Sequence, residues 1–373
     1  MSIRGEAAIA GFFELPTQKE YPGRSVLGLM AEAARGAIID AGLRKDDIDG
    51  LISTEGINSM TVCEYLQIKP NYTTSMTAHG ASGCSAIATA GAVVSAGMAN
   101  YVLVVFGESR PRGSSRLRGE SQARRPGAPS RASEWESPFG PVIAANGGYG
   151  LIKERYMYEY GATDEQFAKC AADERFNAAA NENAVWFEQP VTTEDVLNSR
   201  YTNDPIHLLE SVMPCSGAAA VIVTSAERAR ALPNPPVYLL GASGPAVRHD
   251  VIWQDDDITT TPVVMSAPKA LQMAQYNASD MEFAEFYDCY TVLVMLTLED
   301  AGLVPKGEIG NFYESTDTTY KGEFPINTDG GQIGAGQPGL AGGFRHVVEA
   351  TRQIMGRAGE RQVEKSDLCM VNG

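Results

Sequence analysis

The stretch that decides the fold is residues 77–87, TAHGASGCSAI, in which two glycines stand among small side chains. Residues 86–97, AIATAGAVVSAG, are almost wholly small or apolar, which predicts a helix buried on most sides. Residues 101–107, YVLVVFG, form an apolar run that ends at glycine, as buried strands do. A glycine turn that opens a buried helix directs backbone N–H groups at one point. It therefore suits a nucleophile, an oxyanion or a bound acyl oxygen, although a tightly packed core helix would have the same composition.

The composition is that of a globular protein. The 373 residues are 44% hydrophobic and 20% charged, enough for two domains or one large one. The formal net charge of −16 argues against nucleic acid or an anionic membrane as a partner. No apolar run reaches the roughly 18 residues of a membrane-spanning helix. Residues 1–15 lack the pattern of a signal peptide, so we expect a cytoplasmic protein.

The cysteines and histidines show no metal-binding spacing. Six cysteines are scattered along the chain without a C-x-x-C pair, and the four histidines are far apart in sequence. We therefore predict reduced thiols and no metal site in this chain.

Apolar runs and helical patterns predict strands and helices on both sides of residues 77–107. Residues 7–12 and 50–54 predict strands, and Ser25 begins a helical pattern that Gly42 ends. Residues 149–200 are polar and helical in pattern, which indicates an insertion lying over the core. The apolar residues 216–224 then predict another buried strand.

Residues 110–131 differ from the rest of the chain. They hold seven arginines and one acid, Glu120, with several prolines and glycines. This composition predicts a long loop, and long loops in compact proteins are usually functional or mobile. The loop could hold the phosphates of a nucleotide-tailed substrate, dock an acidic partner, or form a solvated lid.

The second half of the chain repeats the first. Residues 284–287 predict a strand, the glycines within 330–339 open a helix that runs to residue 354, and residues 367–371 predict the matching strand. Two copies of strand, glycine turn, helix and strand predict a duplicated α/β fold with a pseudo-twofold axis. The two glycine turns would face each other across that axis, which is a natural place for a site. We divide the chain into residues 1–240, with an insertion at about 108–205, and residues 241–373.

Four motifs in this order carry a resemblance to a known family. They are GASG at 80–83, SGAAA at 216–220, YDCY at 287–290 and NTDGGQIGAGQPG at 327–339. Their order resembles the thiolase superfamily. More closely it resembles the thiolase-like branch of lipid-transfer proteins and steroid side-chain aldolases, which is related to sterol carrier protein thiolases. The resemblance covers nearly the whole chain and implies a dimeric, duplicated thiolase fold of five αβαβα layers. It also implies a final glycine loop and further strands after Val371.

Two departures from the family pattern bear on the chemistry. A thiolase has its nucleophilic cysteine at the position that matches Gly80, and a histidine at the position that matches Gln337. Glutamine cannot take a proton, and Cys84 lies one turn inside the predicted helix, where we expect it to be packed. Covalent Claisen chemistry therefore has little support.

The resemblance implies a different reaction, in which Tyr290 transfers the proton. A tyrosine at this position is a feature of the thiolase-like aldolases, which cleave a β-hydroxyacyl-CoA by a retro-aldol reaction. Those aldolases also tend to carry a tyrosine where this chain has Gln337. The reaction needs a base for the hydroxyl and donors for the thioester enolate, but no covalent nucleophile. The candidate catalytic residues are Tyr290, Tyr287, Asp288 and Gln337. The candidate substrate-binding residues are Gly80, Ser82, Cys84, Gly336 and Asn327, of which Gly80, Ser82 and Gly336 would form the floor of an open acyl site.

The resemblance also implies partners. Relatives of this branch work with a small DUF35 protein that has an OB-fold and a zinc ribbon, so zinc is expected only in the partner. Coenzyme A is expected as part of the substrate, and no tightly bound cofactor is expected. Two alternatives stay open: a thiolase-type acyltransferase, for example on an aromatic 3-oxoacyl-CoA with Cys84 as nucleophile, and a non-catalytic acyl-CoA-binding scaffold. The sequence does not reveal the acyl group.

The first testable prediction concerns assembly. An acidic chain with an arginine-rich loop is expected to be one part of a complex, so the purified chain should be a homodimer. Co-expression with a DUF35 protein should give a heterotetramer with two smaller chains outside the dimer. Light scattering of both preparations measures the two masses, and full activity of an isolated monomer would refute this assembly.

Overall fold

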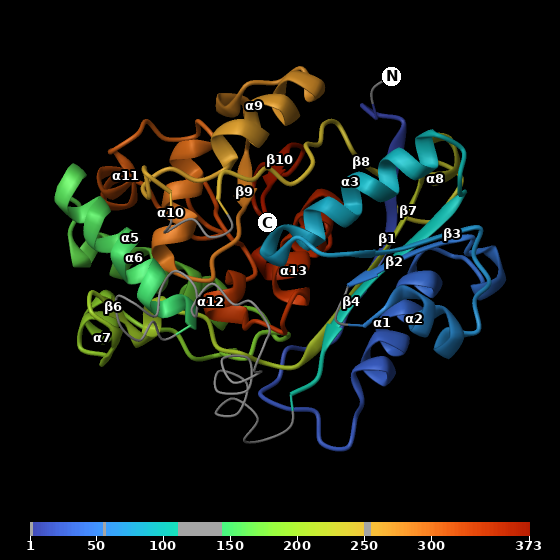
Figure 1. Ribbon diagram of the computed structural model, residues 1–373, viewed down its shortest axis with the longest axis horizontal. Coiled ribbons are helices and arrows are strands. Elements are labelled where there is room, and N and C mark those ends of the chain that lie inside the picture. The colour runs from blue at the N-terminus through green and yellow to red at the C-terminus, as the bar shows by residue number, and fades with distance from the viewer. Residues whose placement is uncertain (1–2, 55–56, 111–143, 250–254) are drawn as a thin grey trace.

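The computed structural model describes residues 3–54, 57–110, 144–249 and 255–373 (Figure 1). Most of the predicted arginine-rich loop, beyond Arg110, lies outside these residues. The first half is built on a six-stranded mixed sheet with the strand order β3-β2-β4-β7-β1-β8. Its strands are β1 (Ala7–Glu14), β2 (Gly50–Thr54), β3 (Tyr72–Met76), β4 (Tyr101–Glu108), β7 (Gly217–Ser225) and β8 (Val237–Tyr238). Strand β2 runs parallel to β3 and β4, whereas β7 is antiparallel to both β4 and β1.

Strand β4 shows how the sheet is covered on both faces. Leu103 and Val105 pack with α1 (Val26–Asp40) and α2 (Ser59–Leu66), while Phe106 on the other face packs with α3 (Ser82–Ser95) and α13 (Ala341–Ile354). A continuous apolar strand of this kind is buried on both faces, as its sequence predicted. Helix α1 begins where expected, because the Ser25 hydroxyl accepts a hydrogen bond from the backbone of Gly28 at 3.1 Å.

The second half repeats this arrangement around α13. Strands β9 (Phe283–Glu285) and β10 (Cys369–Val371) pair in parallel, as β2 and β4 do, and α13 contacts both of them. Helices α9 (Val263–Ala274) and α10 (Thr291–Asp300) cover the outer side. The layers are therefore α1 and α2, the large sheet, α3 with α13, the β9–β10 pair, and α9 with α10. The predicted duplicated α/β fold is confirmed.

The predicted insertion is helical and lies against the second half. It forms α5 (Ala144–Tyr160), α6 (Asp164–Ala179) and α7 (Thr193–Leu197), and the hairpin of β5 (Tyr201–Asn203) and β6 (Ile206–His207) follows. The short helix α8 (Ala226–Ala229) comes after β7 and lies outside the insertion. Helix α6 contacts α10, α11 (Ile309–Ser315) and α12 (Gly331–Ala335). The insertion thus packs on the second half, and the division near residue 240 stays a prediction.

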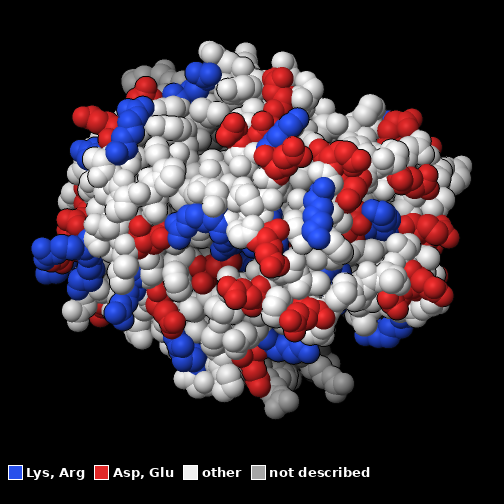
Figure 2. Space-filling view, turned by 180° about the vertical axis from the view of Figure 1, so that it is seen from behind, with Lys and Arg blue, Asp and Glu red and all other residues white. Residues whose placement is uncertain are grey.

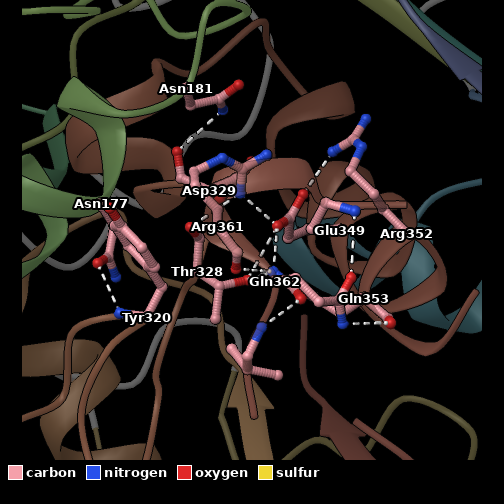
Figure 3. Close-up of polar contacts among 12 residues, drawn as sticks. Asn177, Asn181, Tyr320, Thr328, Asp329, Glu349, Arg352, Gln353, Arg361 and Gln362 are labelled. Carbon is pink, nitrogen blue, oxygen red and sulfur yellow. Dashed lines mark hydrogen bonds and ion pairs between the residues drawn. The ribbon is translucent and has the colours of Figure 1, made fainter. Parts of the chain in front are cut away.

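Helix α13 is buried over nearly its whole length although it carries several charged side chains. Glu349 pairs with Arg352 and Arg361 (Figure 3), and these two guanidinium groups hold the pKa of Glu349 well below its usual range although burial alone would raise it. Arg345 lies 3.1 Å from Glu14 and 3.0 Å from Asp329. A buried charge without a partner is costly, so these pairs must form together when the helix docks.

The charges on the surface are mixed. In Figure 2, Lys and Arg side chains are interspersed with Asp and Glu side chains over the face shown. The acidic excess of the chain is therefore not gathered into one patch on this face.

Helices α3 and α13 approach each other closely at Gly83, and this contact gives the second prediction. A Cβ on Gly83 would lie 2.7 Å from Cα of Phe344. Gly83→Ala should therefore lower the free energy of unfolding by about 1–3 kcal/mol through overpacking, although alanine favours a helix. Gly28→Ala in α1 is the matched control, because its Cβ would meet nothing closer than 3.4 Å. Urea denaturation measures both variants, and equal stability of the two would contradict the packing described here.

Candidate active site

The predicted site residues meet at the N-terminal end of α3, where Tyr287 lies against Gly80. A Cβ on Gly80 would lie 2.6 Å from Cε2 and Cζ of the Tyr287 ring. Gly343, at the start of α13, is equally close: its Cβ would lie 2.5 Å from the Gly80 carbonyl oxygen and 3.0 Å from the same ring. We expected open space beside Gly80, and this is wrong, because the Tyr287 ring occupies it.

Tyr287 is oriented by Gln337. The Gln337 side chain donates a hydrogen bond from Nε2 to the Tyr287 hydroxyl at 3.3 Å, and its backbone is fixed by hydrogen bonds to residues Met213 and Cys215. Burial, with smaller effects of Cys289 and Asp288, raises the pKa of Tyr287 well above its ordinary value. The phenol is therefore neutral and can donate its proton to a hydrogen bond.

Tyr290 is held on the other side of the same loop. Its ring stacks on Tyr149 of α5, with centroids 4.5 Å apart, and its hydroxyl donates a short hydrogen bond to Oδ1 of Asn146. Burial raises the pKa of Tyr290 as well. Tyr149 thus stacks on Tyr290 and borders the same cavity as Gly80 and Tyr287.

Asp288 and Asn327 are fully buried, and their hydrogen bonds hold the loop of residues 286–290 in place. Asp288 accepts hydrogen bonds from the backbone of Gln332 at 2.7 Å and of Ile333 at 3.0 Å. Asn327 has a positive φ of +50°, and its side-chain oxygen accepts from the backbone of Phe286 at 2.7 Å. Their contacts in this structure are internal, so they position the loop that carries the tyrosines.

The predicted floor of Gly80, Ser82 and Gly336 does not form. Ser82 is buried and closes the turn before α3, because its hydroxyl donates to the carbonyl of His79 at 2.7 Å. Gly336 packs against Cys215, since a Cβ there would lie 2.9 Å from that sulfur. Of these three residues, only Gly80 borders the cavity that is described next.

A cavity of about 530 Å³ adjoins the site. Gly80, Cys84, Tyr149 and Tyr287 border it, together with α9, β10 and residues 239–247. It runs along β10, which among the described strands pairs with β9 alone, whereas β4, the counterpart of β10, pairs with both β2 and β7. Tyr149 and Tyr287 border this cavity, whereas Tyr290 does not. Burial raises the pKa of the Cys84 thiol to about 12, although the residue is only partly buried and borders the cavity, so its expected packing stays a prediction.

One group of side chains has the composition of a metal site that the sequence did not indicate. Ligand atoms of Asp164, His207 and Glu210 lie within 4.8 Å of one another. The ammonium group of Lys153 lies 2.7 Å from Asp164 and 2.8 Å from Glu210, so it takes the place of a cation. The group is a buried ion-pair cluster.

Comparisons with known proteins agree with this geometry. Residues 244–373 match the family model described as thiolase C-terminal domain-like. The whole chain is 33% identical to a steroid side-chain-cleaving aldolase of Thermomonospora curvata, across 96% of that protein. It is also 32% identical to an acetyl-CoA acetyltransferase of Methanothermobacter thermautotrophicus, over 92% of this chain and 90% of that protein. A solved structure of the Ltp2-ChsH2(DUF35) aldolase matches with a TM-score of 0.87 and 32% identity, over 96% of this chain and 92% of that chain.

The chain therefore belongs to the thiolase superfamily, in its thiolase-like branch of lipid-transfer proteins and steroid side-chain aldolases. Among the described helices, none combines the length and the apolar character needed to cross a membrane.

The contact between Gly80 and Tyr287 gives the third prediction. Gly80→Cys should weaken turnover and should not create a thiolase, because Gln337 cannot serve as the base. Gly80→Val should be worse, since its branched side chain must displace the Tyr287 ring. Turnover and acyl-CoA affinity of both variants are measured beside their melting temperatures. A Gly80→Val protein that binds and turns over like the parent would show that this glycine serves packing alone.

Proposed function

We propose that the protein cleaves the side chain of a steroid β-hydroxyacyl-CoA by a retro-aldol reaction. The observation that carries this proposal is the absence of a side chain at Gly80 beside the buried phenol of Tyr287, with the buried phenol of Tyr290 on the same loop, in a chain similar along its whole length to a side-chain-cleaving aldolase. Neutral phenols can donate hydrogen bonds and protons, which is what a thioester enolate requires.

The proposed reaction balances without an oxidant or reductant. The Cα–Cβ bond of the substrate breaks, the β-hydroxyl carbon becomes a carbonyl, and the bonding electrons form the thioester enolate. The enolate carbon then takes a proton, so the products are a ketone and a shortened acyl-CoA. One proton is released and one is consumed, so a single group that exchanges its proton with the substrate serves both steps.

Tyr290 is our candidate for that group. Its hydroxyl accepts the proton that leaves the β-hydroxyl as the Cα–Cβ bond breaks and passes its own proton to the enolate carbon, so the phenol is neutral before and after the cleavage. In the structure its hydroxyl donates to Asn146, so the substrate must replace Asn146 as its partner. Tyr287, held by Gln337, would stabilise the charge of the enolate oxygen.

We further propose a homodimer core with one DUF35 partner on each chain. The similarity to the Ltp2-ChsH2(DUF35) aldolase supports the partner. Strand β3 is the edge of the large sheet, and Met60 and Tyr65 on the adjacent α2 are more than half exposed, which supports a dimer surface at this edge.

The proposed location is the cytoplasm. The six cysteines are free thiols, as in a protein of the reducing cytoplasm. Zinc, in this proposal, belongs to the partner.

A thiolase-type acyltransferase is the second candidate, because one full-length relative is an acetyl-CoA acetyltransferase and Cys84 borders the cavity. Iodoacetamide separates the two reactions. Inactivation that acyl-CoA prevents would favour the acyltransferase, whereas full retention of activity favours the aldolase. A protein that binds acyl-CoA without converting it would instead be a scaffold.

The fourth prediction tests the role of Tyr290. Tyr290→Phe should lower cleavage of a steroid β-hydroxyacyl-CoA by at least about a hundredfold, the usual scale for a lost general acid or base. The complex with its DUF35 partner is assayed by mass spectrometry of the ketone and the shortened acyl-CoA. Tyr158→Phe is the matched control, because this tyrosine of α5 is 82% exposed and lies outside the site. Unchanged turnover of Tyr290→Phe would exclude Tyr290 as the proton-transfer group.

A further inference from the structure

A cluster of buried ionisable side chains lies beneath the loop that carries Tyr287 and Tyr290. It comprises Glu174 of α6, Glu285 of β9, Asp288 of the loop itself and His346 of α13, each at most 2% exposed. The four residues come from four different elements, so the cluster forms only when the insertion, the loop and the central helix are packed together.

Asp288 is the acceptor at the centre of this cluster. Its carboxylate receives the two backbone N–H groups at the start of α12, and Nε2 of His346 lies 3.1 Å from its Oδ1. A Cβ on Gly331 would lie 2.2 Å from Oδ2 of Asp288, so a glycine with a positive φ is required at this approach. Burial alone raises the pKa of Asp288, but its contacts with His346 and the N–H groups lower it overall.

Glu174 lies on the other side of Asp288 and lacks a counter-ion. Its Oε1 accepts a hydrogen bond from Nδ2 of Asn327 at 2.8 Å, while its Oε2 is buried without any donor. Among the described residues, no Lys or Arg forms an ion pair with Glu174. A buried oxygen without a donor is costly when it is charged, but it is satisfied if it carries a proton and donates to a neighbouring acceptor. Asp288 is such an acceptor.

The surrounding charges do not offer Glu174 another partner. Asp329 also faces Glu174, but its carboxylate is already paired with Arg345. Arg352 and Arg361 are both paired with Glu349. His346 is shared between Asp288 and Glu285, and these two contacts raise the pKa of His346 to about 9 against the opposite effect of burial. Burial and, next, the negative charge of Asp288 raise the pKa of Glu174 well above its usual range.

We propose that Glu174 is a neutral carboxylic acid that donates a hydrogen bond to Asp288, and that this acid–carboxylate pair positions the Tyr287–Tyr290 loop. Asp288 stands between the two tyrosines in the chain, so its placement sets the placement of both phenols. Glu174 and Asp288 are thus positioning residues, since both are buried and their contacts are internal.

Gln332 connects the pair to Tyr287. Its Nε2 lies 3.2 Å from Oδ1 of Asp288, to which it donates, and its Oε1 is a buried acceptor without a donor. Gln337 donates to the Tyr287 hydroxyl, and Gln332 is the second amide beside that hydroxyl. A hydroxyl that accepts from Gln337 and donates to Gln332 satisfies both amides, so the orientation of the phenol follows from the position of Asp288.

The fifth prediction tests the protonation of Glu174 by the pH dependence of stability. A carboxyl group with a raised pKa in the folded state contributes stability that is fully present below its unfolded pKa and is lost as the pH rises through the folded pKa. Glu174→Gln keeps a donor toward Asp288 but cannot ionise. The melting temperature of Glu174→Gln relative to the parent should therefore rise steadily between about pH 5 and pH 9.

Three outcomes of this measurement are distinguishable. A steady rise supports the neutral acid. A flat difference, or a fall with rising pH, would show that Glu174 is ionised in the folded protein and would overturn the proposal. Glu165→Gln is the matched control, because Glu165 is exposed on the same helix and should show no such slope.

The positioning role is tested by kinetics, and this part rests on the proposed retro-aldol function. In the complex with the DUF35 partner, Glu174→Ala should lower kcat at least about tenfold with KM nearly unchanged, the scale for a displaced catalytic group. Glu174→Gln should restore kcat to within about threefold of the parent because the donor is retained. Equal kcat for Glu174→Ala and the parent would overturn the positioning role. A parent without cleavage activity would instead refute the proposed function and leave the pH test of Glu174 valid.

Discussion

The pairing of buried charges along α13 is the constraint on which the rest of the structure depends. This helix lies between two sheets, yet it presents Arg345, Glu349 and Arg352 to the interior. Arg352 reaches Glu14 of β1 at 2.6 Å, and Arg345 reaches both Glu14 and Asp329. Because each unpaired member would leave a buried charge, the first sheet, the central helix and the loop around Asp329 can dock in only one register.

The docking of α13 also determines the geometry of the candidate site. Gly343 and His346 are on the same helix as the paired charges, so fixing the helix also fixes the surfaces against which Tyr287 and Asp288 rest. The glycines at 80, 83 and 343 permit backbone contacts that any side chain would prevent. The result is a site without a nucleophilic thiol, in which neutral phenols are held by amides and by a buried acid–base cluster.

Local sequence patterns predicted much of the fold, whereas contacts between distant parts of the chain could not be predicted. The helix between Ser25 and Gly42 and the strands β4 and β7 were predicted because caps and apolar runs are local signals. Helix α10 was not predicted, since every residue of it is buried and it shows no amphipathic period. Strand β3, with the sequence YTTSM, was missed because an edge strand can be polar.

At the site, motif order identified Gly80 and the YDCY loop. It could not reveal that Tyr287 fills the space at Gly80 or that Glu174 faces Asp288, because those contacts join distant parts of the chain.

In the proposed reaction the protein breaks a carbon–carbon bond without a thiol nucleophile and without a second coenzyme A. The most direct test incubates the complex with a steroid β-hydroxyacyl-CoA in the absence of free coenzyme A and follows both products by mass spectrometry. We expect equal amounts of ketone and shortened acyl-CoA, with no acyl group attached to any cysteine. Cleavage that requires added coenzyme A and passes through an acyl-cysteine would contradict the proposed reaction.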